Sequence, residues 1–195
     1  MSAKFSNTTA DFLEWGQAMN LIRNLYNDKK YKMSLLVSFG CFFGLRISDI
    51  LNLKWEAIYD KDEFELIEKK TKKKREIKIN GQLKKHIYDC YQQIKPKSLG
   101  EFIFMSQKGS KYSIQRINIM LKDIKTRYNL KIRNFSTHSL RKSFGREIFN
   151  RSGENAELAI VKLSHLFNHS NPAITRRYLG ISQKELLETY DVLSF

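Results

Sequence analysis

The sequence has few cysteines and no apolar run long enough to cross a bilayer. Its two cysteines, Cys41 and Cys90, do not form the spacing pattern of a secreted protein stapled by disulfides. Cys41 lies in an apolar run, where a small buried residue is expected. The first residues contain no apolar segment of the signal-peptide type. These absences predict a cytoplasmic protein with no membrane partner.

Acidic residues are scarce as well. The chain has 35 Lys and Arg residues against 20 Asp and Glu residues, which gives a formal net charge of +15. Such an excess neutralises phosphates and releases condensed counterions, so it favours a nucleic-acid partner. A generally basic surface would give the same composition without that partner, and charge alone leaves both interpretations open. The 42% of hydrophobic residues predict a folded core, and 195 residues suit one domain.

Most of the chain has the apolar periodicity of α-helices. Intervals of three and four predict an amphipathic helix over residues 12–26, with Asp11 in its first turn. Residues 31–43 are apolar almost all round, which predicts a buried helix that ends at Gly44. A short helix is expected through Leu53. Further helices are predicted at residues 82–94, 112–128, 138–150, 156–167, 171–179 and 182–190.

One segment has the alternation of β-strands instead. Residues 64–67 and 76–79 alternate apolar and polar side chains on either side of a cationic turn from Lys69 to Arg75. This pattern predicts two antiparallel strands joined by a basic loop. Residues 101–105 indicate a further short strand or connector. The predicted fold class is therefore mainly α with a small antiparallel β-sheet, an α+β domain.

Side chains of complementary chemistry are spread along this fold. They are Arg46, Lys70, His138, Arg141, His169 and Tyr178. Two guanidiniums can neutralise the non-bridging oxygens of a phosphorane, where charge develops during displacement. A tyrosine hydroxyl can be the nucleophile, and a lysine or a histidine can protonate the departing sugar oxygen. The set predicts attack on a phosphodiester without any cofactor or metal.

The motifs around these residues carry a family resemblance. They are Gly44-Leu45-Arg46 followed by Ser48-Asp49, the run Thr137 to Arg141 with Leu140 before its arginine, and His169 nine residues before Tyr178. Over roughly residues 30–181 the chain resembles the tyrosine recombinase (phage integrase) family. Phe167-Asn168 stands where that family commonly has leucine and glycine. Asn168 tolerates the left-handed conformation, so the turn is expected to survive.

The resemblance implies both a fold and an activity. The fold is that of a tyrosine recombinase catalytic domain, and the six residues are its catalytic set. The activity is that of a site-specific recombinase or integrase, which cuts and rejoins DNA through a 3′-phosphotyrosyl intermediate without metal or ATP. The partners implied are double-stranded DNA and further copies of the chain, a free monomer assembling into a tetramer on paired DNA sites. Location on the nucleoid is expected when the protein is bound to DNA.

The domain organisation has an expected boundary near the C-terminus. Residues 1–180 are predicted to form the catalytic domain, and residues 181–195 a tail helix. This apolar tail either packs on its own subunit or, as the resemblance implies, docks in trans on a neighbour. About 30 residues precede the first catalytic helix, too few for a separate DNA-clamping domain. The chain therefore resembles the short, single-domain recombinases, or it is part of a longer integrase.

Several assignments within the site stay open. The resemblance places the general acid at Lys70, which lies 24 residues after Arg46, and Lys73 is the second candidate. Arg46 could pair with Asp49 or another carboxylate instead of a phosphate. His165 and His169 have the i, i+4 spacing of metal ligands, but no glutamate lies between them and no metal site is predicted.

Cationic residues around the hairpin and before the tyrosine are predicted to contact DNA. They are Lys69, Lys72, Lys73, Lys74, Arg75, Arg176 and Arg177. Tyr190 is the alternative to Tyr178 as the nucleophile. Two other classes of protein remain compatible with the sequence. One is a type IB topoisomerase-like DNA relaxase, and the other is a catalytically inactive DNA-binding regulator with the same fold.

Overall fold

The computed structural model describes residues 10–181 and divides the chain into two compact units. The first unit runs to Phe144 and the second begins at Gly145, a division that falls inside a helix. The sequence predicted no boundary there. The predicted boundary at residue 180 stays a prediction, because the tail helix expected at residues 182–190 lies outside the described residues.

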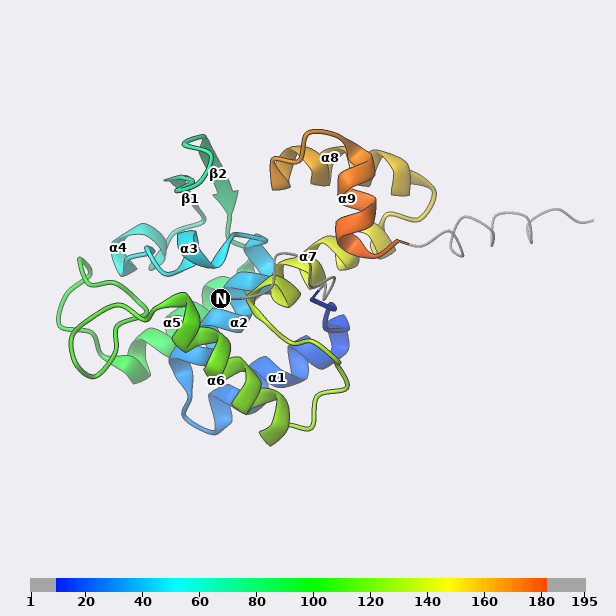
Figure 1. Cartoon of the computed structure of the whole chain (residues 1–195). Helices are drawn as coiled ribbons and strands as arrows, with labels where there is room; N and C mark the ends of the chain where they lie inside the picture. Colours follow the sequence, from blue (N-terminus) through cyan, green and yellow to red (C-terminus); the bar gives the residue numbers. More distant parts are fainter. Residues whose placement is uncertain (1–9, 182–195) are drawn as a thin grey trace, which may run out of the picture. The chain divides into compact units, whose positions relative to one another are not determined.

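The elements are mainly helical, as the sequence predicted (Figure 1). The first unit contains α1 (Trp15–Asn27), α2 (Tyr31–Phe43), α3 (Ile47–Ile50), α4 (Trp55–Ile58), β1 (Glu63–Ile67), β2 (Lys74–Lys78), α5 (Gly81–Ile94), α6 (Ile114–Arg127) and the start of α7 (Thr137–Arg151). The second unit contains the rest of α7, a 3₁₀ turn (Gly153–Asn155), α8 (Ala156–Phe167) and α9 (Pro172–Leu179). The predicted fold class, mainly α with a small antiparallel sheet, is confirmed.

Helix α2 is the centre of the first unit. It packs against α1 and α5, and Leu35, Leu36 and Phe39 are completely buried within it. Burial of each such side chain stabilises the fold by about 1.5 to 3 kcal/mol. The helix ends at Gly44, whose φ of 57° is left-handed, as the sequence predicted. The chain turns there, and this turn leads directly to Arg46.

Gly44→Ala should destabilise the protein by about 2 to 5 kcal/mol, because it combines left-handed strain with overpacking. A Cβ at this position would overlap the ring of Phe144. The measurement is the free energy of unfolding in denaturant. The matched control is Gly16→Ala in the first turn of α1, where a Cβ meets nothing within 4 Å. The control should change stability by less than about 1 kcal/mol. Equal effects of the two substitutions would contradict this account of Gly44.

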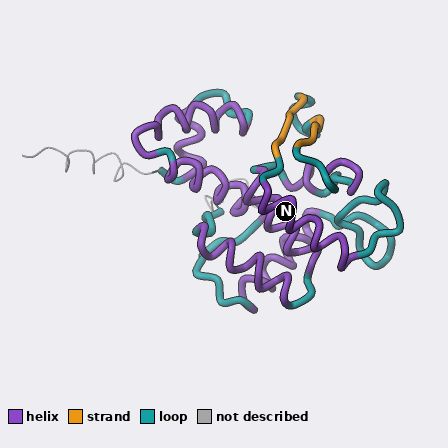
Figure 2. The backbone as a smooth tube through the Cα atoms, turned by 180° about the vertical axis from the view of Figure 1, so that it is seen from behind, coloured by secondary structure: helices purple, strands orange, loops and turns teal. Residues whose placement is uncertain are grey.

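The two strands form a hairpin that projects from the helices of the first unit (Figures 1 and 2). They pair antiparallel, with Phe64 opposite Ile77 and Leu66 opposite Arg75. The second strand begins at Lys74, two residues earlier than the sequence predicted, so the loop between the strands is shorter. The segment 101–105 makes only isolated bridges, among them Lys54 with Phe102.

The segment before α1 is attached to the rest of the first unit by hydrogen bonds. Helix α1 begins at Trp15, and Asp11 therefore lies outside its first turn, contrary to the prediction. The Asp11 carboxylate instead accepts a hydrogen bond from the backbone N–H of Asn134 at 3.0 Å. The Ser143 hydroxyl accepts from the N–H of Leu13 at 2.8 Å. Asp11 therefore takes part in a long-range hydrogen bond and does not lie in the first turn of α1.

The second unit is a close packing of three helical segments. At Gly145 of α7 a Cβ would meet Leu179 Cδ2 at 2.5 Å, so this contact requires glycine. Asn168 ends α8 in the left-handed conformation, with a φ of 53°, as its sequence position predicted. The Asn171 side chain caps α9 by accepting from the N–H of Ile174 at 3.0 Å. Pro172 occupies the first turn of α9, where its missing N–H costs nothing.

Neither cysteine forms a disulfide. Cys41 and Cys90 are both buried, and burial raises the pKa of each thiol to about 12. The prediction that Cys41 is a small buried core residue is confirmed. Over residues 10–181, no helix combines the length and the apolar character that a membrane span requires.

Candidate active site

Four of the six predicted catalytic residues line one pocket of the first unit. This pocket has a volume of about 230 Å³ and is bordered by Arg46, Lys70, His138 and Arg141. The other lining residues are Leu45, Ile47, Ser48 and Thr137. The residues come from the turn after α2, the hairpin loop and the start of α7, so segments almost 100 positions apart meet here.

The C-terminus of α2 fixes one of the two pocket arginines. Helix ends leave backbone carbonyls without intrahelical partners, and cations near a helix C-terminus are favourable. Arg141 Nη1 donates to the Gly44 carbonyl at 2.7 Å, and Arg141 is almost fully buried. Arg75 Nη2 donates to the Phe43 carbonyl at 2.8 Å. The two guanidiniums therefore satisfy the last carbonyls of α2, and the one from Arg141 also borders the pocket.

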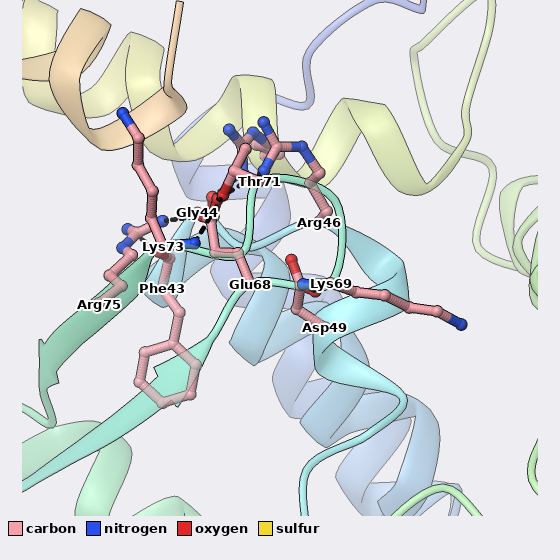
Figure 3. A network of polar contacts seen from close by, with 10 residues as sticks. Phe43, Gly44, Arg46, Asp49, Glu68, Lys69, Thr71, Lys73 and Arg75 are labelled. Carbon is pink, nitrogen blue, oxygen red and sulfur yellow. Dashed lines mark hydrogen bonds and ion pairs between the residues drawn. The ribbon is translucent and has the colours of Figure 1, made fainter.

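Arg46 is held by a buried carboxylate. Its Nη1 donates to Glu68 Oε2 at 2.8 Å (Figure 3). The Glu68 side chain is 0% exposed. The sequence left open a pair with Asp49 or another carboxylate, and the partner is Glu68. Asp49 Oδ1 accepts instead from the backbone N–H of Lys69 at 2.9 Å. About 20% of the Arg46 side chain stays exposed, so the arginine keeps an accessible surface beside the pocket.

His138 adds a group that can accept a proton. Desolvation lowers the pKa of its imidazole, and the positive charges of Arg141, Lys142 and Arg46 lower this pKa further. The shift below the usual value means that the ring is neutral at pH 7. A neutral imidazole in the same pocket as two guanidiniums can accept a hydrogen bond or a proton, while the guanidiniums bind an anion.

The structure distinguishes the two lysines proposed for the general acid. Lys70 is exposed and lines the pocket, whereas Lys73 is not among the lining residues. In Figure 3 the Lys73 side chain extends away from the buried carboxylates. This placement favours Lys70.

The other two predicted residues meet in the second unit. The rings of His169 and Tyr178 have their centroids 5.3 Å apart and cross at 73°. His169 Nδ1 shares a hydrogen bond of 2.9 Å with the Thr175 hydroxyl, which orients the imidazole. Phe167 packs edge-on against the tyrosine ring at 5.5 Å. The half-buried Tyr178 is therefore held between two rings, one of which carries nitrogen atoms able to bind a proton.

His165 lies exposed on α8. The part of the chain that the structure describes contains no group of three His, Cys, Asp or Glu residues able to hold a metal ion.

The residues predicted to contact DNA have different environments. Lys69, Lys72, Lys73 and Arg177 are exposed. Lys74 is also exposed, and its ammonium lies 2.7 Å from Glu65 on the neighbouring strand.

Two of the predicted arginines are engaged within the protein. Arg176 pairs with Glu157 on α8. The Arg75 side chain is 11% exposed and turns inward to Phe43 and Glu68, and its contact with DNA stays a prediction.

Sequence reasoning missed Glu68 and Thr71. Thr71 Oγ1 donates to Glu68 Oε2 at 2.7 Å, the same oxygen that binds Arg46. A signal was present in the alternation of the strand, because Glu68 continues the inward positions 64 and 66. Arg75 faces inward for the same reason, because it lies two residues before the buried Ile77 and alternate residues of a strand lie on one face. Because this segment is highly charged, the inward positions of Glu68 and Arg75 were not recognised from the sequence.

Comparison with known proteins gives concordant matches. The phage integrase family matches residues 12–185. A protein of Bacillus subtilis (strain 168), Probable integrase/recombinase YoeC, is 36% identical over 170 residues, which are 86% of this chain and 87% of that protein. Tyrosine recombinase XerC of Caldanaerobacter subterraneus is 25% identical over 190 residues, 96% of this chain. The chain spans only about half, 52%, of the length of XerC.

A solved structure has the same fold. The XerH site-specific recombinase, bound to palindromic difH substrate in a post-cleavage complex, superposes with a TM-score of 0.72 at 16% identity. The match covers 98% of this chain and 55% of XerH. The fold and these matches define a site-specific recombinase of the tyrosine type, and the predicted enzyme class is confirmed. The chain belongs to the phage integrase family.

Proposed function

We propose that this chain cuts and rejoins double-stranded DNA through a 3′-phosphotyrosyl intermediate. The observation that carries the proposal is the pocket in which two guanidiniums, a neutral imidazole and a lysine converge. These groups fit a scissile phosphate, because guanidiniums offer paired donors to phosphate oxygens and hold their charge at every physiological pH.

Each residue has a part in the proposed reaction. Arg46 and Arg141 bind the non-bridging oxygens and stabilise the phosphorane. The Tyr178 oxygen attacks phosphorus, the bond to the 5′ oxygen breaks, and Lys70 protonates that oxygen. The proton of the tyrosine passes to a base, a role for which the imidazoles of His138 and His169 are suited. Attack by a 5′ hydroxyl of another strand reverses these steps and conserves the bond energy.

Charge supports DNA as the substrate. The net charge is +15, and the loop of the hairpin presents Lys69, Lys72 and Lys73 to solvent. Such a surface binds phosphate backbones with little sequence preference. XerH, which has the same fold, is bound to its difH substrate. We extend this proposal to assembly as a tetramer on paired DNA sites and to a location on the nucleoid.

The proposed chemistry needs neither metal nor ATP. The charge that a metal ion supplies to phosphoryl transfer comes here from Arg46, Arg141 and Lys70. The energy of the broken phosphodiester bond is conserved in the phosphotyrosyl ester. Rejoining of the strands therefore requires no hydrolysis of ATP.

The test is covalent capture of DNA. The purified chain is incubated with a pool of nicked duplexes with a randomised core, in EDTA and without ATP, and the covalent adducts are isolated and sequenced. We expect adducts that converge on one sequence, which then serves as the cognate duplex. Absence of adducts would support the inactive DNA-binding regulator, and dependence on added metal would contradict the mechanism. Relaxation of a plasmid without strand exchange would support the topoisomerase-like alternative.

Lys70→Ala should slow cleavage of the cognate duplex by roughly 10²- to 10⁴-fold, the usual range for loss of a general acid. A substrate with sulfur in place of the 5′ oxygen should restore the rate, because a thiolate leaves without protonation. The measurement is the single-turnover rate on the two substrates. The control is Lys73→Ala, which should be slowed little on either. If the sulfur substrate rescues Lys73→Ala and leaves Lys70→Ala slow, the general acid is Lys73.

A further inference from the structure

Glu68 connects the pocket to the hairpin loop through one oxygen atom. Its Oε2 accepts from Arg46 Nη1 at 2.8 Å and from Thr71 Oγ1 at 2.7 Å. Its Oε1 lies 3.6 Å from Nη1 of Arg75. A fully buried carboxylate is costly unless cations and hydroxyls compensate it. Here the carboxylate lies between the guanidiniums of Arg46 and Arg75 (Figure 3), and Arg46 also borders the pocket.

The loop itself is fixed on both sides of Lys70. The backbone N–H of Lys69 donates to Asp49 Oδ1 at 2.9 Å, and the hydroxyl of Thr71 donates to Glu68. The loop closes through the N–H of Lys72, which donates to the Glu68 carbonyl at 2.9 Å. Lys70 therefore lies between two residues that are each bound to a buried carboxylate. Its long side chain stays exposed and free to reach into the pocket.

We propose that Glu68 and Thr71 are positioning residues that align Arg46 and Lys70 with each other. The carboxylate holds the guanidinium with one oxygen and, through the Thr71 hydroxyl, fixes the turn that carries the lysine. The positions of Arg46, which binds the phosphate, and of Lys70, which donates the proton, thereby both depend on one oxygen atom of Glu68. This inference rests on the proposed function, in which Arg46 binds the phosphate and Lys70 protonates the 5′ oxygen.

The charge of Glu68 fits this role. Burial alone would raise the pKa of its carboxyl group, but hydrogen bonds from Thr71 and Arg46 and the charges of Arg46 and Arg75 bring the pKa below its usual value. The group is therefore ionised at neutral pH and accepts both hydrogen bonds. As the pH falls through this lowered pKa, the carboxyl group becomes protonated and its hold on Arg46 weakens.

The first test uses the half-buried Thr71, whose loss leaves the core intact. Thr71→Val keeps the shape of the side chain and removes the hydroxyl. It should slow cleavage of the cognate duplex roughly 10- to 100-fold, the scale of a misplacement of about 1 Å. The 5′-sulfur substrate should restore the rate, because the damage is to proton donation. Thr71→Ser should retain nearly the full rate on both substrates, because it keeps the hydroxyl.

The second test uses the carboxylate. Glu68→Gln should slow cleavage on the oxygen substrate at least as much as Thr71→Val. Sulfur should rescue it only in part, because Arg46 is disturbed as well. The matched control is Glu65→Gln, which makes the same change of charge at an exposed position of the same hairpin and should keep the normal rate. Thermal unfolding is measured for every variant, and if Glu68→Gln does not fold, the Thr71 pair decides.

The outcomes separate this inference from the proposed function. If Lys70→Ala is rescued by sulfur but Thr71→Val cleaves at the normal rate, the positioning role is wrong and the function stands. A Thr71→Val variant that is slow on both substrates to the same extent also overturns the role, since a general loss of structure gives that result. If wild-type protein forms no adduct, or Lys70→Ala is not rescued, the proposed function itself fails.

Discussion

Tyr178→Phe is expected to lower formation of the covalent protein–DNA adduct by more than about a thousandfold, because it removes the nucleophilic oxygen. Phenylalanine has the same aromatic ring and keeps the edge-on packing against Phe167 and His169. DNA affinity and thermal stability should therefore stay close to those of the wild type. The measurement combines single-turnover adduct formation on the cognate nicked duplex with a binding titration of the same duplex.

Two controls make this result specific to the hydroxyl of one tyrosine. Tyr88→Phe removes a phenolic oxygen from an exposed side chain of α5 and should leave adduct formation unchanged. Tyr190→Phe tests the alternative nucleophile named from the sequence. A Tyr178→Phe protein that still forms adduct, together with a Tyr190→Phe protein that does not, would move the nucleophile to the tail.

Arg141→Ala should lower the cleavage rate by about 10²- to 10³-fold, as expected when one fixed donor to a developing charge is removed. A second, smaller effect on stability is expected. The Gly44 carbonyl loses its 2.7 Å partner, and an unsatisfied buried acceptor costs about 1 to 3 kcal/mol. Single-turnover cleavage and denaturant unfolding measure the two effects separately.

Arg141→Lys tests the geometry of the guanidinium more specifically than Arg141→Ala, because it keeps the positive charge. A lysine cannot both satisfy the Gly44 carbonyl and present paired donors to a phosphate, so cleavage should stay strongly impaired. Arg151→Ala on the same helix is the control, since it removes an exposed arginine paired with Glu147. Near-normal cleavage by Arg141→Lys would contradict the role of Arg141 as a phosphate clamp.

Local patterns in the sequence were sufficient for many features of the fold. Two examples are the apolar run of α2 with its end at Gly44 and the left-handed Asn168, which each depend on the preferences of one short segment. The division after Phe144 could not be predicted in this way. Helix α7 runs through it without a linker, and the close contact of Gly145 with Leu179 depends on tertiary packing.

The site was predicted less completely than the fold. Spacing and residue chemistry brought together Arg46, His138 and Arg141, which the structure places around one pocket. The residues that hold these side chains in place could not be predicted from local patterns. The hydrogen bond between Arg46 and Glu68, for example, joins segments 22 residues apart. Arg75 was assigned to the loop, because the sequence placed the start of β2 two residues too late. Its inward direction follows from the alternation of this strand, in which positions 75 and 77 lie on the same face.

The most direct test of the central claim is the chemical identity of the covalent link. Adduct trapped on the cognate nicked duplex is digested with protease and nuclease, and the peptide that retains nucleotide is sequenced by mass spectrometry. We expect a single modified peptide, with the 3′ phosphate of DNA esterified to the oxygen of Tyr178. A phosphate on any other residue, or no covalent nucleotide on a protein that nevertheless recombines DNA, would contradict the mechanism.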